Sequence, residues 1–215
     1  MYLSKTIYVR VWNCPKGAWI CKYHPELAPL DANTHARFKT GNEVGDLARG
    51  LFGPSVNVTV LRDDGSLDLP AMIRRTAEEM EKGTSVICEA SFSYEGLYCA
   101  VDLLKKEGDS WAIYEVKSSS DGLQDKYIAD VSYQKYVLEH CGLKVTGVYL
   151  VCIDSSYILG EEGLERLQHL QAGTHVVVEP VHHLLVAFAD DGAVHDTDVF
   201  RAQILDFSGQ HFLEA

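Results

Sequence analysis

Three strands in a row, joined by two tight turns, most constrain how this chain can fold. Apolar stretches at residues 85–93, 97–105 and 111–118 have compositions typical of strands, and short polar segments containing glycine separate them. Glu95-Gly96 and Gly108-Asp109 suit two-residue hairpin loops, because such loops require positive φ angles that glycine and aspartate tolerate. We therefore expect three consecutive antiparallel strands.

The loop at residues 108–109 determines the register of the second hairpin. Counting outward from that loop places Asp102 directly opposite Glu115, and facing side chains in such a pair have Cβ atoms about 4.5–5.5 Å apart. Lys117 points to the same face because side chains alternate along a strand. The first hairpin, counted in the same way, places Glu89 opposite Asp102 on the other side.

The facing acids Asp102 and Glu115 need a compensating charge. They lie among apolar residues of two strands, where like charges repel and uncompensated burial costs free energy. One interpretation is a divalent cation such as Mg²⁺, which is typically held by one or two carboxylates and keeps its other positions for water and phosphate. The alternative is structural: Glu115 forms a buried ion pair with Lys117, and Asp102 is hydrogen-bonded to the backbone.

Other segments surround these strands with helices. Ser4 is a suitable N-cap and Pro15 a suitable first residue for two short helices. The pattern predicts helices at 4–13, 15–23, 41–52, 69–83 and 125–142, strands at 56–61 and 145–153, and a loop at 24–35. Beyond residue 154 the signals are weaker and allow one helix at 160–173 and one or two strands at 174–189. This order describes an α/β sandwich with a mixed sheet.

Charge divides the chain at about residue 153. The formal net charge is −12, which argues against a nucleic-acid partner. However, residues 154–215 contain 11 acids and two arginines, whereas residues 1–40 contain six basic residues and two acids. We predict a core over 1–153 with basic N-terminal helices, and an acidic C-terminal extension over 154–215 that could bind a protein partner.

The sequence also bears on location and on cysteine chemistry. It has no long uncharged apolar run and no signal-peptide pattern at its start, so we expect a cytoplasmic protein that does not enter a membrane. The six cysteines form no CxxC pair and are expected to be free thiols.

An aspartate on one strand, Glu-x-Lys on the next and a glutamine on the following helix resemble the PD-(D/E)XK nuclease superfamily. The resemblance is greatest to its RecB-like exonuclease branch, which includes CRISPR-associated exonucleases and uncharacterised bacterial RecB-like proteins. It runs through LSKTIYVRVWNCPKGAW, GNEVGDLARGLF, CEASFSYEGLYCAVDLL, WAIYEVKSSS and DVSYQKYVLE. It implies a restriction-endonuclease-like core, in which a mixed sheet with an antiparallel hairpin is flanked by helices. It also implies metal-dependent hydrolysis of DNA, by an exonuclease in repair, recombination or defence.

The resemblance assigns roles to five residues. Asp102 and Glu115 would bind Mg²⁺ or Mn²⁺, with the backbone carbonyl of Val116 as a possible further ligand. Lys117 would position the attacking water and stabilise charge at phosphorus, and Gln134 would orient the substrate or the lysine. The chemistry would be metal-assisted phosphodiester hydrolysis.

Further residues are candidates for contacts with DNA. Ser118 and Ser119 could donate hydrogen bonds to phosphate, although a solvated strand end would have the same composition. Lys126 and Tyr127, with the basic N-terminal helices, would approach the phosphate backbone and the bases. Tyr136 stands near the position of a tyrosine in the QxxxY motif of the branch.

The chain departs from the branch in three ways. The metal-ligand histidine of many RecB-like enzymes corresponds to Gly45, for which Glu43 is the available substitute; an acid in the first turn of a helix is the alternative reading. Leu138 replaces the tyrosine of QxxxY. Cys14 lies in a CPxxxW-like setting, but no cysteine follows Cys152, so an iron-sulfur cluster is not expected. These departures favour the rival hypothesis, a non-catalytic DNA-binding or assembly module that retains the nuclease fold.

Overall fold

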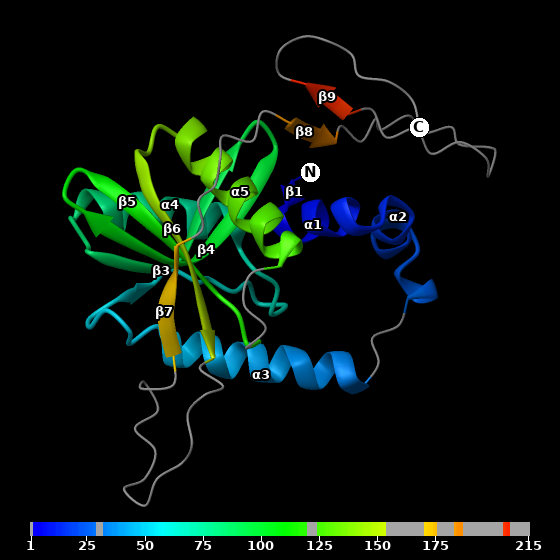
Figure 1. Ribbon diagram of the computed structural model, residues 1–215, viewed down its shortest axis with the longest axis horizontal. Coiled ribbons are helices and arrows are strands. Elements are labelled where there is room, and N and C mark those ends of the chain that lie inside the picture. Colours follow the sequence, from blue (N-terminus) through cyan, green and yellow to red (C-terminus); the bar gives the residue numbers. More distant parts are fainter. Residues whose placement is uncertain are drawn as a thin grey trace, which may run out of the picture.

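The computed structural model describes residues 2–28, 32–119 and 124–153, together with short strands at 170–175, 183–186 and 204–206. Figure 1 shows the arrangement of these elements. In chain order they are β1 (Leu3–Ser4), α1 (Lys5–Asn13), α2 (Pro15–Tyr23), the 3₁₀ turn η1 (Pro25–Leu27), α3 (Ala32–Ala48), β2 (Val56–Asn57), α4 (Leu69–Glu81), β3 (Val86–Tyr94), β4 (Leu97–Glu107), β5 (Ser110–Val116), α5 (Asp125–His140), β6 (Val145–Ile153), β7 (Leu170–His175), β8 (His183–Val186) and β9 (Ile204–Asp206).

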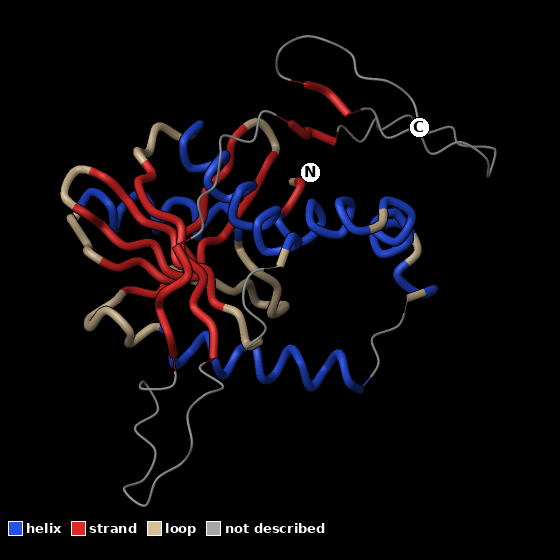
Figure 2. The backbone as a smooth tube through the Cα atoms, in the orientation of Figure 1, coloured by secondary structure: helices blue, strands red, loops and turns tan. Residues whose placement is uncertain are grey.

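Figure 2 shows that most strands gather in one sheet with helices beside it. Its strand order is β2-β3-β4-β5-β6-β7, and β1 pairs with β4 outside this path. The pairs β3–β4, β4–β5 and β6–β7 are antiparallel, whereas β1–β4, β2–β3 and β5–β6 are parallel. Strands β8 and β9 form a separate two-stranded sheet. The predicted α/β class with a mixed sheet flanked by helices is confirmed.

Helices cover both faces of the sheet. On one face α1 and α5 bury Tyr8, Val131 and Val137 against apolar residues of β3, β4 and β5. On the other face α3 buries Val44 and Ala48 against a second apolar cluster. Tyr8 of α1 stacks on Tyr133 of α5, with ring centroids 4.8 Å apart. The start of the chain is thereby held against the helix that follows the β4–β5 hairpin.

The predicted registers of both hairpins are confirmed. Glu107 pairs with Ser110 and Leu103 with Tyr114, which is the register that a loop at 108–109 requires. In the first hairpin Cys88 pairs with Leu103 and Ala90 pairs with Val101. The same register places Glu89 opposite Asp102.

Four predicted helices are confirmed to within about two residues, at 4–13, 15–23, 69–83 and 125–142. Ser4 is the N-cap of α1, as predicted, and accepts a hydrogen bond from the N–H of Ile7. The strand at 145–153 is also confirmed.

Two predicted elements have wrong boundaries: both ends of the helix at 41–52 and the end of the strand at 56–61. The helix expected at 41–52 spans Ala32–Ala48, because the stretch after Pro29 contains no helix breaker before Gly41, although its polar composition resembles a loop. The predicted strand at 56–61 pairs in the sheet only over Val56–Asn57. The guanidinium of Arg75 donates to the carbonyls of Asn57, in β2, and of Thr59, just beyond it.

Part of the acidic extension joins the sheet. Strand β7 pairs antiparallel with β6, so the helix predicted at 160–173 is wrong from residue 170 onward. Residues 160–169 lie outside the described part of the chain. The strands expected at 174–189 are borne out at the end of β7 and at β8. The domain division at residue 153 stays a prediction. Among the described residues, no helix has an apolar stretch long enough to cross a bilayer.

Candidate functional site

Asp102 lies between the part of β4 that pairs with β1 and the part that pairs with β5. Leu103 is the last residue in the β4 ladder with β5, whereas residues 97–98 pair with β1 instead. Between these two ladders, Asp102 Oδ2 accepts a 2.8 Å hydrogen bond from the backbone N–H of Val116. Strand β1 leads directly into α1 at Lys5. Three segments that are distant in sequence therefore meet at Asp102.

Lys5 bridges the two predicted metal-binding acids. Its Nζ lies 3.1 and 3.0 Å from the two carboxylate oxygens of Glu115 and 3.5 Å from Asp102 Oδ1. The two carboxylates thus converge on one position, and a cation of the chain itself occupies that position.

Lys117 and Gln134 hold Glu115 from its other side. Lys117 Nζ lies 2.7 Å from Glu115 Oε1 and 2.6 Å from Asp130 Oδ2. Gln134 Nε2 donates to Glu115 Oε2 at 2.8 Å and to Asp130 Oδ1 at 3.0 Å. Lys117 points to the face of Glu115, as the strand alternation predicted. We refer to Lys5, Asp102, Glu115, Lys117, Asp130 and Gln134 as the charged cluster.

The charged cluster is largely shielded from water. The side chain of Glu115 is 3% exposed and that of Lys117 is 18% exposed, while Gln134 is fully buried. The Oε1 atom of Gln134 has no hydrogen-bond partner among the described residues. In such surroundings each charge depends on its neighbours rather than on solvent.

Burial acts differently on the two acids. Burial, followed by repulsion from Glu115, raises the pKa of Asp102. Burial alone would also raise the pKa of Glu115, but attraction to Lys5 and Lys117 and the hydrogen bonds from Lys117 and Gln134 outweigh it and hold that pKa well below its usual range. The negative charge therefore resides on Glu115, because three donors lie within 3.1 Å of its oxygens.

Both lysines of the charged cluster are positively charged at neutral pH. Burial alone would lower the pKa of Lys5, but Asp102, Glu115 and Asp130 outweigh this effect and raise it. The same balance raises the pKa of Lys117, through Glu115 and Asp130. Each ammonium group thus carries a positive charge that compensates the buried carboxylates.

Glu89 has a strained backbone beside this cluster. Its φ is 57°, a left-handed conformation that non-glycine residues rarely adopt. The side-chain alternation of both strands shifts at this point: Cys88 and Leu103 face the α3 side, yet Ala90 and Val101 face the opposite core. Strain of this kind costs about 1–3 kcal/mol and is often found at functional sites. Burial raises the pKa of the Glu89 carboxyl group.

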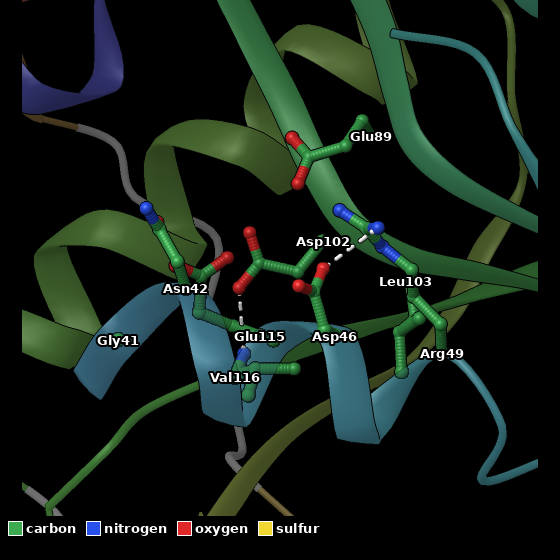
Figure 3. A pocket seen from close by; sticks show the side chains of 10 residues that line it. Gly41, Asn42, Asp46, Arg49, Glu89, Asp102, Leu103, Glu115 and Val116 are labelled. Carbon is green, nitrogen blue, oxygen red and sulfur yellow. Dashed lines mark hydrogen bonds and ion pairs between the residues drawn. The ribbon is translucent and has the colours of Figure 1, made fainter. Parts of the chain in front are cut away.

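A cavity of about 480 Å³ opens beside the two acids. Figure 3 shows Glu89, Asp102 and Glu115 around it, with residues of α3 on the other side. It is lined by Gly41, Asn42, Gly45, Asp46, Arg49, Glu89, Asp102, Leu103, Glu115 and Val116. Four of these residues are acids and one is basic. Arg49 forms a 2.7 Å ion pair with Asp46, and the carboxyl groups of Glu89, Asp102 and Glu115 remain as oxygen ligands that a cation could use.

The α3 helix presents other residues than Glu43 to this cavity. The Glu43 side chain is 63% exposed and lies 4.0 Å from Lys39, whereas Asn42 and Asp46 line the cavity. Glu43 lies about 100° around the helix from Asn42 and about 60° from Asp46, so it falls outside the narrow sector that faces the cavity. If α3 contributes an acid to the site, Asp46 is the better placed residue.

The candidate phosphate contacts lie along the outer edge of the charged cluster. Ser118 is exposed, and Ser119 Oγ lies 2.8 Å from the hydroxyl of Tyr127. Tyr127 is buried, and the centroid of its ring is 5.2 Å from Lys117 Nζ and 4.9 Å from Lys126 Nζ. The exposed groups here are Ser118 and Lys126, while Tyr127 supports the lysines by cation–π contacts.

Tyr136 is separate from this group. Its ring packs on His140 with centroids 3.9 Å apart, and His140 in turn contacts Tyr94 of β3. Tyr136 therefore belongs to a cluster of rings at the end of α5, and Gln134 is the α5 residue that reaches the acids.

Two members of the charged cluster were not identified from the sequence. Lys5 belongs to the LSK segment and Asp130 to the DVSYQKY segment, both of which carry the resemblance to RecB-like proteins. Asp130 and Gln134 are four residues apart on α5, so they share a face of the helix. That spacing was the available signal for Asp130, whereas the reach of Lys5 depends on the pairing of β1 with β4.

The geometry is compatible with a single divalent cation at Asp102 and Glu115. Because both carboxylates lie within 3.5 Å of one nitrogen, small side-chain shifts would bring their oxygens to the ligand distances of about 2.0–2.6 Å of Mg²⁺ or Ca²⁺. Carboxylate oxygens are the donors that hard cations prefer. Among the described residues, however, no three His, Cys, Asp or Glu side chains are grouped closely enough to form a metal site by themselves.

The cysteines are free thiols. Cys14 is the N-cap of α2, and its Sγ accepts a 3.3 Å hydrogen bond from the N–H of Gly17.

Comparison with models of known protein families gives no match for this chain, and no curated protein has a significantly similar sequence.

Proposed function

We propose that this protein is a metal-dependent nuclease with a RecB-like PD-(D/E)XK core, which hydrolyses DNA phosphodiester bonds with Mg²⁺ or Mn²⁺. One observation supports the proposal most: Asp102 and Glu115 converge on a single cation position beside an acidic cavity. The strained backbone at Glu89, on the same cavity, is a second indication of a functional site.

The residues of the charged cluster would divide the work. Asp102 and Glu115 would hold the cation, with Glu89 and the carbonyl of Val116 as candidate further ligands. The cation supplies Lewis-acid assistance, which activates water and stabilises charge on phosphate. Lys117 would orient the attacking water or stabilise the developing charge. Gln134 holds the Glu115 carboxylate in place through its 2.8 Å hydrogen bond.

The N-terminal helices offer a surface for DNA. Helices α1 and α2 contain no acid and include Arg10 and the exposed Lys16. Trp12 and Tyr23 are 52% and 43% exposed, and such rings can stack on bases of a single strand. Lys5 connects the start of α1 to the charged cluster, and basic and aromatic groups further along α1 and α2 fit an enzyme that binds the phosphate backbone and reads little sequence. We further propose a cytoplasmic role in DNA repair, recombination or defence, with the acidic extension as a candidate contact for a protein partner.

A second candidate function is a non-catalytic DNA-binding or assembly module. It is favoured by the position of Lys5, whose ammonium already compensates Asp102 and Glu115. The contacts of the structural alternative are also present, since Lys117 pairs with Glu115 and Asp102 accepts a backbone hydrogen bond. A module of this kind would bind DNA equally well with and without divalent metal.

A cleavage assay distinguishes the two functions. The protein is incubated with linear and circular DNA, single- and double-stranded, with Mg²⁺, with Mn²⁺ and with chelator. We expect metal-dependent cleavage of linear DNA, reduced by about 10²–10³-fold in Lys117→Ala. Lys82→Ala is the matched control, because Lys82 forms a 2.6 Å ion pair with Glu79 on the exposed surface of α4. Absence of cleavage with either metal, or equal cleavage by Lys117→Ala and the wild type, contradicts the nuclease proposal.

A further inference from the structure

Lys5 occupies the place in which a shared cation would have to lie. Its Nζ is 3.0 Å from Glu115 Oε2 and 3.5 Å from Asp102 Oδ1. A divalent cation needs the same oxygens at about 2.0–2.6 Å. An ammonium group and a metal ion cannot both bind there, because they would lie in contact and carry charge of the same sign.

We propose that Lys5 is a built-in counter-cation that holds Asp102 and Glu115 together in the metal-free protein, and that a divalent cation binds by displacing it. The inference rests on the metal site of the proposed function and adds a competition between that metal and a residue of the chain. Lys5 thereby sets the metal affinity of the site and preserves its shape when metal is absent.

Only the side chain of Lys5 has to move. Its backbone is held by the pairing of β1 with β4, by the Ser4 cap of α1 and by a hydrogen bond from the Tyr133 hydroxyl to the carbonyl of Leu3. The Lys5 side chain is flexible and 19% exposed, so solvent can reach it. The exchange is therefore a rotamer change beside a fixed helix end.

The contacts of Lys5 favour such an exchange. Its Nζ lies within 3.5 Å of oxygens of both Asp102 and Glu115. A divalent cation on the same oxygens would lie next to the ammonium group of Lys5, and two positive charges repel strongly in a poorly solvated site. When Lys5 leaves, the cation replaces it as the counter-charge of both carboxylates, while Lys117 keeps its ion pairs with Glu115 and Asp130.

Calorimetric titration with Mn²⁺ tests the competition without using activity. We expect Lys5→Met to bind Mn²⁺ about tenfold or more tightly than the wild type, since a positive charge within 3.5 Å of the ligand oxygens is lost. Lys82→Met removes a lysine from an exposed ion pair and should bind Mn²⁺ like the wild type. Lys5→Gln keeps a polar side chain without the charge and serves as the second variant if Lys5→Met fails to fold.

Chemical labelling provides an independent measurement on the wild-type protein. Lysine amines are modified with an acylating reagent, with and without Mn²⁺, and the modification of each lysine is measured by mass spectrometry. Labelling of Lys5 should rise when Mn²⁺ is added, because the displaced amine enters solvent, while labelling of Lys82 should not change.

The outcomes separate this inference from the proposed function. Unchanged or weaker Mn²⁺ binding by both Lys5 variants overturns the inference, as does Lys5 labelling that stays constant or falls on adding Mn²⁺. Absence of Mn²⁺ binding in every protein also overturns it. Tighter binding by Lys5→Met in a protein that cleaves no DNA supports the inference and contradicts the nuclease proposal. If the wild type cleaves DNA in the presence of metal but binds Mn²⁺ with the same affinity as Lys5→Met, the nuclease proposal is supported and this inference is contradicted.

Discussion

Replacement of Glu115 by glutamine changes the charge of the central residue of the cluster with almost no change in shape. Glu115 is 2% exposed, and its oxygens lie 2.7 Å from Lys117 Nζ and 3.0 Å from Lys5 Nζ. The variant leaves these two ammonium groups with weaker partners in a poorly solvated site. We expect a large loss of stability.

The magnitude follows from the contacts that remain. Removing one partner of a buried ion pair costs about 3–5 kcal/mol. In Glu115→Gln, Lys117 keeps Asp130 at 2.6 Å and Lys5 keeps Asp102 at 3.5 Å, so neither ammonium is wholly uncompensated. The loss should therefore lie near the lower limit, at about 3 kcal/mol.

Urea denaturation followed by circular dichroism at pH 7 measures this loss. Glu43→Gln is the matched control, because the Glu43 side chain is 63% exposed and lies 4.0 Å from Lys39; exposed pairs of this kind contribute about 0.2–1 kcal/mol. The wild type should also gain thermal stability from Mg²⁺ or Mn²⁺, and Glu115→Gln should lose that gain. A Glu115→Gln protein within 1 kcal/mol of the wild type would refute the assigned charge network.

Three further predictions concern neighbouring residues. Burial and repulsion from Glu115 raise the pKa of Asp102 to about 7, so without metal the folded protein keeps a proton on Asp102 that the unfolded chain loses near pH 4. The free energy of unfolding should therefore fall between pH 4 and pH 7, by at most about 1.4 kcal/mol per pH unit. Denaturation experiments across this range should show a weaker pH dependence for Asp102→Asn than for the wild type. Glu89→Gly should raise the free energy of unfolding by about 1 kcal/mol, because glycine adopts the positive φ of this position without strain. The same variant should bind Mn²⁺ more weakly. A variant less stable than the wild type would contradict the backbone strain assigned to Glu89. Gln134→Leu removes two hydrogen bonds to carboxylates and should cost about 2–3 kcal/mol, a value checked by the same denaturation experiment and contradicted by a change below 1 kcal/mol.

The hairpins show why part of the site could be predicted from sequence. Turn chemistry is local, and the loop at residues 108–109 determines every pair along β4 and β5. Asp102, Glu115 and Lys117 were therefore placed on one face before any tertiary contact was considered. Gln134 required the resemblance to known nucleases, because the distance from α5 to β5 is not encoded in the spacing of residues on either element.

Helix α3 shows where local patterns were insufficient. Its first turns lack an apolar stripe, so its polar composition suggested a loop. The interpretation of the site also depended on this segment, since Glu43 was proposed as the substitute for a metal-ligand histidine from its place between Gly41 and Gly45 in sequence. The helix rotation places Asn42 and Asp46 at the cavity instead, and that rotation is set by the burial of Val44 and Ala48 against the sheet.

The sequence by itself determined the class of the fold, the registers of both hairpins and the facing carboxylates, because alternation, turn residues and helix caps act over a few residues. Only the tertiary structure decided what compensates those carboxylates. Strand β1 takes the place beside β4 that β5 leaves, and this long-range pairing brings Lys5 to within 3.0 Å of Glu115. The cation position between the two acids is thus created by segments more than 90 residues apart, and no local pattern could have revealed its occupant.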